Sequence, residues 1–382
     1  MKWKVTLSDL NFDQRERKMV DEVIENRWLT MGEIVERLEE EFAHFMGARH
    51  AITVSSGTAA LHLAMRALNI KPPDQVIVPS LSFVASSNAI LYVGAKPTFV
   101  DISGWNDFNL SCEDLEKKIT NKTKAIVVVH YGGYLADMQE IKRIARKHKL
   151  FVIEDSAHAI GADLNSKMAG TLGEVGCFSF FSNKNLATGE GGMILTHNDR
   201  LARKLKLLRS HGMTSMTLNR HKGHTYTYDV VELGYNYRMT EISAALGILQ
   251  LKKLHRANKK RKVLTELYMS NLKGIDGFSI PFRDYPRKSS YHLFPILLNK
   301  KVNRKKFMEF LKKERIQSSI HYPPIHKFSY YRKNLRGNQT KLPLTEYVGA
   351  HQVTLPLHPL LEKEDVIFVC DKIKKILPQV LR

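Results

Sequence analysis

The chain has few cysteines and no long apolar run, and both absences exclude whole classes of protein. Its three cysteines, Cys112, Cys177 and Cys370, are far apart and odd in number, so they indicate neither a disulfide framework nor a metal cluster. No apolar stretch reaches the length of a membrane span, and the N-terminal residues lack the apolar core of a signal peptide. The sequence therefore predicts a cytoplasmic protein with reduced cysteines, no metal site and no membrane anchor.

Acidic residues are also scarce: 38 Asp and Glu stand against 59 Lys and Arg, which leaves a formal net charge of +21. This balance is compatible with a nucleic-acid partner, but the densest basic runs, 252–262 and 300–313, fit the solvated faces of amphipathic helices. No zinc-finger spacing, basic region with heptads or aromatic RNA-binding signature accompanies them. The sequence therefore predicts no nucleic-acid partner, and the positive field favours a small anionic substrate such as a nucleotide diphosphate.

Short apolar runs alternate with helical patterns from about residue 49, which is typical of an α/β domain with a mainly parallel sheet. Helices are expected between the strands, among them 59–68 and 138–148. The predicted strands are 50–54, 75–79, 97–100, 124–129, 150–154, 178–181 and 193–196. The predicted fold class is therefore α/β, with helices flanking a mainly parallel central sheet.

The pattern changes near residue 250, where a long helix over 242–272 is predicted to lead out of the large domain. A smaller α/β unit of domain size follows. Its predicted elements are a strand over 291–298 and helices over 304–315 and 363–377. We therefore expect a large domain, 1–250, and a small C-terminal domain, 251–382, against which the N-terminal segment has room to pack.

Lys184 lies between an aromatic strand pattern, 177–181, and a glycine cluster, 189–192. Most lysines are solvated surface groups, but this one is predicted on a turn between two strands, where active-site groups are often mounted. Asp155 ends a separate apolar run upstream. A lysine amine can form a Schiff base with the aldehyde of pyridoxal phosphate, while a carboxylate opposite the pyridine nitrogen keeps the ring protonated. The pair therefore suggests a pyridoxal phosphate enzyme.

Further residues are candidates for contact with such a cofactor. Gly57 and Thr58 follow a predicted strand and open a helix, so their amides suit a phosphate, although the same pattern is typical of an ordinary helix cap. Asp155 is also compatible with a strand-end turn, and Ser179 with a solvent-facing serine on an alternating strand. Phe83 is placed to stack on a pyridine ring, but an isolated Phe is more often a core residue.

Four stretches in this order resemble the DegT/DnrJ/EryC1/StrS family of sugar aminotransferases, within the fold-type I aspartate aminotransferase superfamily. The stretches are 51–61, 153–159, 177–192 and 234–247. The resemblance extends over nearly the whole chain, and several separate motifs make it specific. It implies the pyridoxal phosphate-dependent transferase fold of type I, with a large cofactor-binding domain and a smaller C-terminal domain.

The resemblance also implies a role for each candidate in this sequence. Lys184 would carry the Schiff base, and Asp155 would face the pyridine nitrogen. Gly57, Thr58 and Ser179 would hold the cofactor phosphate.

Three more cofactor contacts are implied in the same way. Phe83 would fill the family's stacking position over the cofactor. His158 stands where many members have Gln, and an imidazole can still hydrogen-bond the phenolic oxygen. Asn236 matches an asparagine that reaches the cofactor phosphate of the neighbouring subunit, which implies a homodimer with shared active sites. Spacing alone does not indicate this role, because the segment 234–237 is also suited to turning the chain into the next helix.

By the same resemblance, the protein is expected to be an aminotransferase that converts a nucleotide-linked keto-sugar to an amino-sugar. L-glutamate would be the amino donor, and the pathway would make a surface polysaccharide or a secondary-metabolite sugar. Segments 27–30 and 221–226 would border the sugar nucleotide, but they do not indicate which sugar or base is bound.

Two other functions are alternatives to that of an aminotransferase. Dehydratases of the same family replace the Schiff-base lysine with histidine, whereas this chain has Lys184. A non-catalytic regulator that binds pyridoxal phosphate would carry a DNA-binding unit, but no helix-turn-helix pattern precedes residue 49 or follows residue 272. Both comparisons favour transamination.

Overall fold

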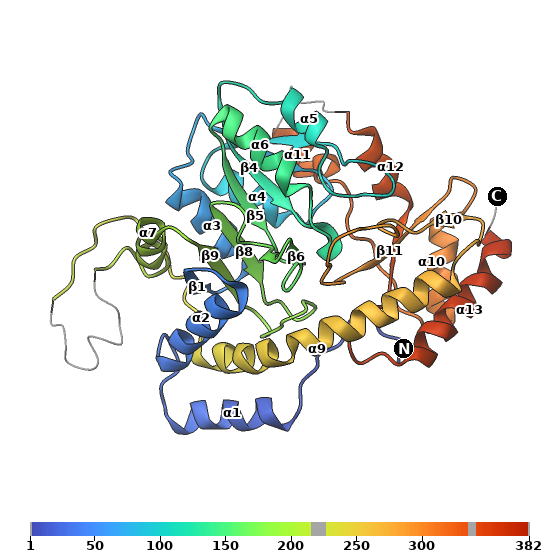
Figure 1. The fold of residues 1–382 in the computed structure, drawn as a ribbon, viewed down its shortest axis with the longest axis horizontal. Coiled ribbons are helices and arrows are strands. Elements are labelled where there is room, and N and C mark those ends of the chain that lie inside the picture. The colour runs from blue at the N-terminus through green and yellow to red at the C-terminus, as the bar shows by residue number, and fades with distance from the viewer. Residues whose placement is uncertain (1, 215–226, 335–340, 381–382) are drawn as a thin grey trace.

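The computed structural model describes residues 2–214, 227–334 and 341–380. Its largest sheet has seven strands and lies at the centre of the large domain (Figure 1). The strands are β1 (His50–Val54), β2 (Gln75–Pro79), β3 (Lys96–Val100), β4 (Thr123–Val129), β5 (Phe151–Asp155), β8 (Val175–Ser179) and β9 (Gly192–Thr196). Their order is β1-β9-β8-β5-β4-β2-β3. Within this sheet only β9 runs antiparallel to its neighbours. The predicted α/β fold with a mainly parallel sheet is confirmed.

Helices cover both faces of this sheet. They are α2 (Glu33–Met46), α3 (Gly57–Ala67), α4 (Ala85–Tyr92), α5 (Cys112–Lys117), α6 (Met138–His148) and α7 (Asp199–Arg209), whereas α1 (Gln14–Glu25) packs against the long helix α9 (Glu241–Asn271). In β2, Val76 and Val78 join a buried core with α3 and α4, whereas Ile77 joins a core with α5 and α6 on the other face. Successive strand residues point to opposite faces, so burial on both faces explains why these strands are apolar throughout.

The C-terminal part contains a second, antiparallel sheet and its own helices. These elements are β10 (Phe278–Ser279), β11 (Phe294–Leu298), β12 (Gln352–Leu355), α9 (Glu241–Asn271), α10 (Arg304–Lys313), α11 (Ser329–Asn334), α12 (Pro343–His351) and α13 (Lys363–Val380). Their core includes Phe294 and Phe307, and it takes in Val5 from the N-terminal segment. Although α9 has 31 residues, no helix in the described part of the chain is long and apolar enough to cross a membrane.

Helix α9 connects the two parts of the molecule and runs beneath both of them in Figure 1. Near its start, Ala244 and Ile248 pack into a core with α2 and the lysine turn. Farther along, Leu264 and Tyr268 pack into the core of the small sheet. We propose that the boundary between the domains falls within this helix, near residue 250.

Two predicted strands differ from the observed strands by more than one residue at an end. The strand expected over 178–181 is β8, which ends at Ser179, because the chain turns away there and Phe181 forms only an isolated bridge with Gly189. The strand expected over 291–298 begins at Phe294. Tyr291 has a φ of 51°, and this left-handed conformation is incompatible with an extended strand.

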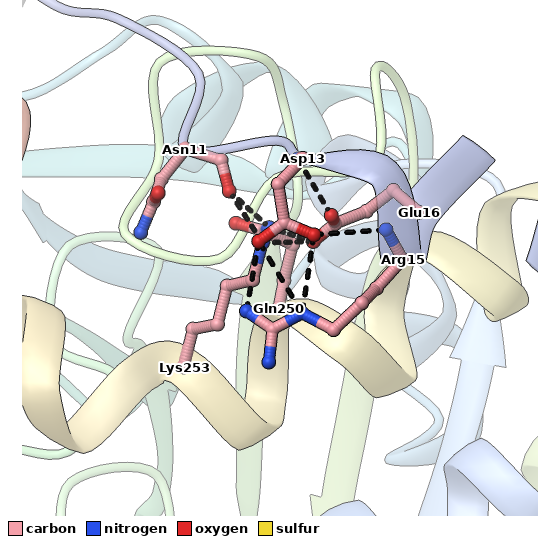
Figure 2. Close-up of polar contacts among 6 residues, drawn as sticks. All are labelled: Asn11, Asp13, Arg15, Glu16, Gln250 and Lys253. Carbon is pink, nitrogen blue, oxygen red and sulfur yellow. Dashed lines mark hydrogen bonds and ion pairs between the residues drawn. The ribbon is translucent and has the colours of Figure 1, made fainter. Parts of the chain in front are cut away.

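Helix α1 is attached to α9 by a set of polar side chains (Figure 2). Lys253 Nζ lies 2.6 Å from Glu16 Oε1 and 2.9 Å from Asp13 Oδ2. Gln250 Nε2 donates a hydrogen bond to Glu16 Oε1 at 2.8 Å. Glu16 is only 2% exposed, so its carboxylate depends on these donors in place of water.

Replacing Lys253 with methionine should destabilise the protein by about 3 kcal/mol, because the buried carboxylate of Glu16 loses its charged partner. The measurement is the free energy of unfolding in urea. Arg15→Ala is a suitable control, since Arg15 also pairs with Asp13 at 2.8 Å but its side chain is 66% exposed. Solvent screens an exposed pair, so the control should retain its unfolding midpoint. Equal destabilisation of the two variants would contradict the role assigned to Lys253.

Candidate active site

Lys184 lies on the turn between β8 and β9, at the edge of the sheet where β5 and β8 end. Its backbone amide donates to the carbonyl of Phe181 at 2.8 Å, and the amide of Thr188 donates to the carbonyl of Phe180 at the same distance. Burial lowers the pKa of Lys184 to about 8, and the charge of Asp155 opposes this effect. A substantial fraction of the Lys184 amine is therefore neutral near pH 8, and the neutral form can accept a proton.

Asp155 is the last residue of β5 and is 8% exposed. Ser86 Oγ donates to Asp155 Oδ2 at 2.6 Å, and the amide of Ala157 donates to Oδ1 at 3.3 Å. Burial raises the pKa of Asp155, while these two hydrogen bonds and the charge of Lys184 favour the ionised form. Two donors and a nearby amine thus counteract the cost of a buried carboxylate.

His158 is part of a buried group of rings beside Lys184. The amide of Gly132 donates to His158 Nδ1 at 3.3 Å, so Nδ1 is the acceptor and Nε2 carries the proton that is donated to Tyr322 Oη at 3.0 Å. The His292 ring lies 4.4 Å from the His158 ring, centroid to centroid. Burial and the charge of Lys184 hold the pKa of His158 well below its usual range. His158 is therefore a neutral hydrogen-bonding group.

Gly57 and Ser179 lie against each other near the start of α3. A Cβ atom added to Gly57 would be only 2.7 Å from Ser179 Cβ, so glycine permits this close approach. The Ser56 hydroxyl accepts the amide of Ala59 at 3.1 Å. The amides of Gly57 and Thr58 are in the first helical turn, where the helix supplies no acceptor. They are free to bind an anion, with the helix dipole in support.

Phe83 and Asn236 are both exposed at the surface of this chain. The Phe83 ring is 57% exposed, and its centroid lies 5.9 Å from that of Tyr322. Asn236 forms an isolated backbone bridge with Ser210. Its side chain makes no hydrogen bond within the described residues, and it does not join the Lys184 group. The structure thus brings Phe83 beside the Tyr322 ring but leaves Asn236 facing outward.

The two segments expected beside the sugar nucleotide differ in what the structure shows. In segment 27–30, the carbonyl of Leu29 accepts the amide of Glu241, the first residue of α9. The Leu29 side chain is 50% exposed. Segment 221–226 lies outside the described residues.

The residues at this edge fit pyridoxal phosphate in three respects. Gly57 and Ser179 form a close backbone approach beside free helix amides, as a phosphate requires. Lys184 has the lowered pKa that makes an amine reactive toward an aldehyde. Asp155 has no ion-pair partner within 4 Å among the described residues, so a protonated ring nitrogen would supply the cation that its buried carboxylate lacks.

Several residues of this site were not predicted from the sequence. Ser86 fixes Asp155, Tyr322 bonds to His158, and Asn185 Oδ1 lies 2.9 Å from His292 Nδ1. Asn185 follows Lys184 directly, so its position in the sequence indicated that it would lie near the site. Ser86 and Tyr322 are distant in sequence from the residues they contact, and only the tertiary structure brings them together.

Replacing Tyr322 with phenylalanine should lower kcat about tenfold, because the buried Nε2–H of His158 loses its acceptor and the ring is less firmly oriented. The measurement is steady-state kinetics, with urea denaturation as a check on folding. Tyr347→Phe is the matched control, since Tyr347 lies on α12 and outside this site, and it should retain wild-type kcat. An unchanged kcat in the Tyr322 variant would exclude this orienting role.

The fold and the site together define an enzyme of the fold-type I pyridoxal phosphate class, with a lysine on a turn near a strand-end aspartate. The chain belongs to the DegT/DnrJ/EryC1/StrS aminotransferase family, whose model matches residues 11–374. The resemblance inferred from the sequence motifs is thereby confirmed. The cofactor of this family is pyridoxal phosphate.

Similar proteins cover nearly the whole chain. GDP-perosamine synthase from Vibrio cholerae is 37% identical over 371 residues, which are 95% of this chain and 96% of that protein. PseC from Helicobacter pylori, an aminotransferase of pseudoaminic acid biosynthesis, superposes with a TM-score of 0.93 at 32% identity and covers 99% of this chain and 100% of its own. The PLP form of Spr1654 from Streptococcus pneumoniae has a TM-score of 0.92 at 27% identity, with both chains covered completely.

Proposed function

We propose that this protein transfers an amino group from L-glutamate to a nucleotide-linked keto-sugar, in the synthesis of a surface polysaccharide or a secondary-metabolite sugar. The observation that carries the proposal is the pairing of Lys184, whose pKa is lowered, with the buried carboxylate of Asp155 at one edge of the sheet. Family membership and the similarity to a protein named GDP-perosamine synthase support this substrate class.

When bound, pyridoxal phosphate supplies an aldehyde that takes up the amine and a ring that accepts electrons. In our proposal, the neutral Nζ of Lys184 removes the proton from the donor carbon that bears the amine, and it returns a proton to the sugar carbon in the second half-reaction. The Asp155 carboxylate supplies negative charge opposite the ring nitrogen. His158, oriented by Tyr322 and the amide of Gly132, presents a neutral hydrogen-bonding ring beside these groups.

A hollow of about 650 Å³ lies next to this site and has room for the substrate. Its walls are largely aromatic and include Phe83, Tyr322, Phe328 and Tyr330. Flat rings of this kind suit a nucleotide base. We propose that the nucleotide part of the substrate lies in this hollow, while the sugar approaches Lys184.

Substrate profiling tests the proposed function. The enzyme is first incubated with L-glutamate, freed of it, and then mixed with a panel of nucleotide-linked keto-sugars, and the amino-sugar is detected by mass spectrometry. Formation of one amino-sugar, with no product from free keto-sugars, is expected. Release of water from the sugar in place of amine transfer would indicate a dehydratase, and no reaction with any amino donor would favour a non-catalytic protein.

We also propose a homodimer in which Asn236 contributes to the site of the partner. Asn236 is exposed, and Val230, Val231 and Leu233 just before it are exposed as well, Leu233 by 74%. Exposed apolar residues in succession are typical of a surface that another chain covers. A second copy of this chain would bury them and place Asn236 near a second active site.

Mixing two inactive variants tests the shared site. If Asn236 acts across the interface, Lys184→Ala and Asn236→Ala protomers should restore roughly half the wild-type activity per mixed dimer, since one of the two sites receives both intact side chains. The activity is measured after proven subunit exchange. Full activity of a strictly monomeric protein, or no recovery in mixed dimers, would instead make Asn236 a structural turn residue.

A further inference from the structure

A crevice of about 820 Å³ lies between α9 and the segment 282–291. One face of the helix forms one wall, with Asn258, Lys259, Lys262 and Thr265 among its residues. Phe45, Tyr134, Gly161 and Met168 are also part of the lining. The crevice shares no lining residue with the aromatic hollow at Phe83 and Tyr322, so it is a separate site.

The crevice carries a strong excess of positive charge. Its basic lining residues are Lys259, Lys262, Arg283, Arg287 and Lys288, against Glu266 as the one acidic residue in the lining. Ion pairs partly neutralise three of the five: Lys288 lies 2.8 Å from Asp163, Lys262 lies 3.7 Å from Glu266, and Arg287 lies 3.9 Å from Asp137.

Two of these cations remain available to a ligand. Lys259 and Arg283 are exposed and make no ion pair with any residue that the structure describes. Both line the crevice, Lys259 from α9 and Arg283 from the 282–291 segment. Two unpaired cations in the lining of one crevice attract an anion, and the surrounding positive charges reinforce the attraction.

The other lining groups suit a ligand that has an aromatic ring and polar atoms in addition to its negative charge. Tyr285 and Tyr291 offer flat rings, and the Tyr285 hydroxyl is fixed by the amide of Leu135 at 2.6 Å. Thr265 is 1% exposed, and its Oγ1 has no hydrogen-bond partner among the described residues. An unpaired buried hydroxyl is unfavourable unless a water or ligand bonds to it. The crevice therefore combines cations, flat rings and an unused polar group.

We propose that this crevice is a second binding site, distinct from the active site, for an anion of the nucleoside diphosphate class. The adjacent phosphates lie between Lys259 and Arg283, where each cation bonds a phosphate oxygen. The base lies against the Tyr285 and Tyr291 rings. The site gives a specific role to part of the large positive charge of the chain.

The crevice is also linked to the active site through hydrogen bonds. Asn258, in its lining, accepts from Asn185 Nδ2 at 2.9 Å and donates to the carbonyl of Ile160 at 2.9 Å. Asn185 adjoins Lys184 in sequence and bonds to His292. A ligand that shifts Asn258 therefore acts on the residue next to the reactive lysine.

Hydrogen–deuterium exchange on the cofactor-loaded enzyme locates the binding of uridine diphosphate independently of activity. Peptides covering 254–269 and 282–291 should become protected, and calorimetry should show this binding weakened at least about tenfold in the double variant Lys259→Ala/Arg283→Ala. The matched control is Lys252→Ala/Arg256→Ala, which removes two exposed cations of α9 outside the crevice and should bind like wild type.

Each other outcome overturns the proposal. Protection confined to peptides containing Phe83 and Tyr322 would mean that only the active site binds the nucleotide. If uridine diphosphate binding weakened equally in the two double variants, the net positive charge of the protein, and not a specific site, would explain the binding. Pyrophosphate binding as tightly as uridine diphosphate would exclude recognition of the base and leave a simple phosphate site. None of these readouts depends on the proposed transamination.

Discussion

Replacing Lys184 with alanine is expected to lower transamination by more than about a thousandfold, the largest effect of any substitution in this chain. Lys184 is half-buried. Among the described residues, it is the only lysine near Asp155 at this edge of the sheet. In the proposed mechanism, no other residue that the structure describes moves the proton at the reacting carbon. The measurement is the rate of amino-sugar formation at saturating glutamate.

Covalent labelling checks the same assignment without an activity assay. Borohydride reduction of the cofactor-loaded wild-type enzyme, followed by peptide mapping, should place the label on Lys184, and Lys184→Ala should remain unlabelled. Lys167→Ala, which removes an exposed lysine from the short β7 strand (Lys167–Met168), should label normally. A label on any other lysine of the wild-type enzyme would show that the assignment is wrong.

Replacing Asp155 with asparagine should lower the rate of the glutamate half-reaction by about 100- to 1000-fold while the fold is preserved. The amide keeps the shape of the side chain and can still accept from Ser86, but it has no charge with which to hold a ring nitrogen protonated. Stopped-flow absorbance with glutamate measures this step. A half-reaction near the wild-type rate would remove Asp155 from the mechanism.

Ser86→Ala tests the same carboxylate by changing the pKa of Asp155 without removing its charge. The hydrogen bond from Ser86 favours the charged form of Asp155, so its loss should raise the pKa of Asp155 further. A raised pKa means that the carboxylate stays protonated to a higher pH, and the acidic limb of the pH–rate profile should move upward. A profile that does not move would show that Ser86 has no influence on the charge of Asp155.

Local patterns in the sequence were sufficient for the elements that carry the site. The apolar run before Asp155 and the glycine cluster after Lys184 predicted a strand end and a turn, and both are observed. The limits of β8 were less accurate, because Phe180 and Phe181 have strand propensity whether or not they pair with a neighbour. Pairing is decided by the turn geometry that follows Ser179.

Composition gives the net charge of the chain but not the positions of the charged side chains in the structure. The excess of basic residues is visible in the sequence, and it favoured a small anionic ligand over nucleic acid. The sequence does not show that Lys259 and Arg283 line the same crevice, since one belongs to a helix and the other to a later loop segment. Folding places them together, and it pairs the neighbouring Lys288 with Asp163.

The sequence alone determined the fold class and the family, and it predicted the residues that we propose to bind pyridoxal phosphate. These follow from periodicity, from turn residues and from motifs in which the chemistry and the local backbone are encoded together. The tertiary structure decided the ionisation and orientation of those residues. Ser86 hydrogen-bonds to Asp155, and Tyr322 and the amide of Gly132 hydrogen-bond to His158. Burial lowers the pKa of Lys184. A pKa and a tautomer depend on solvent exclusion and on partners distant in the chain, so they become defined only when the packed structure brings these groups into contact.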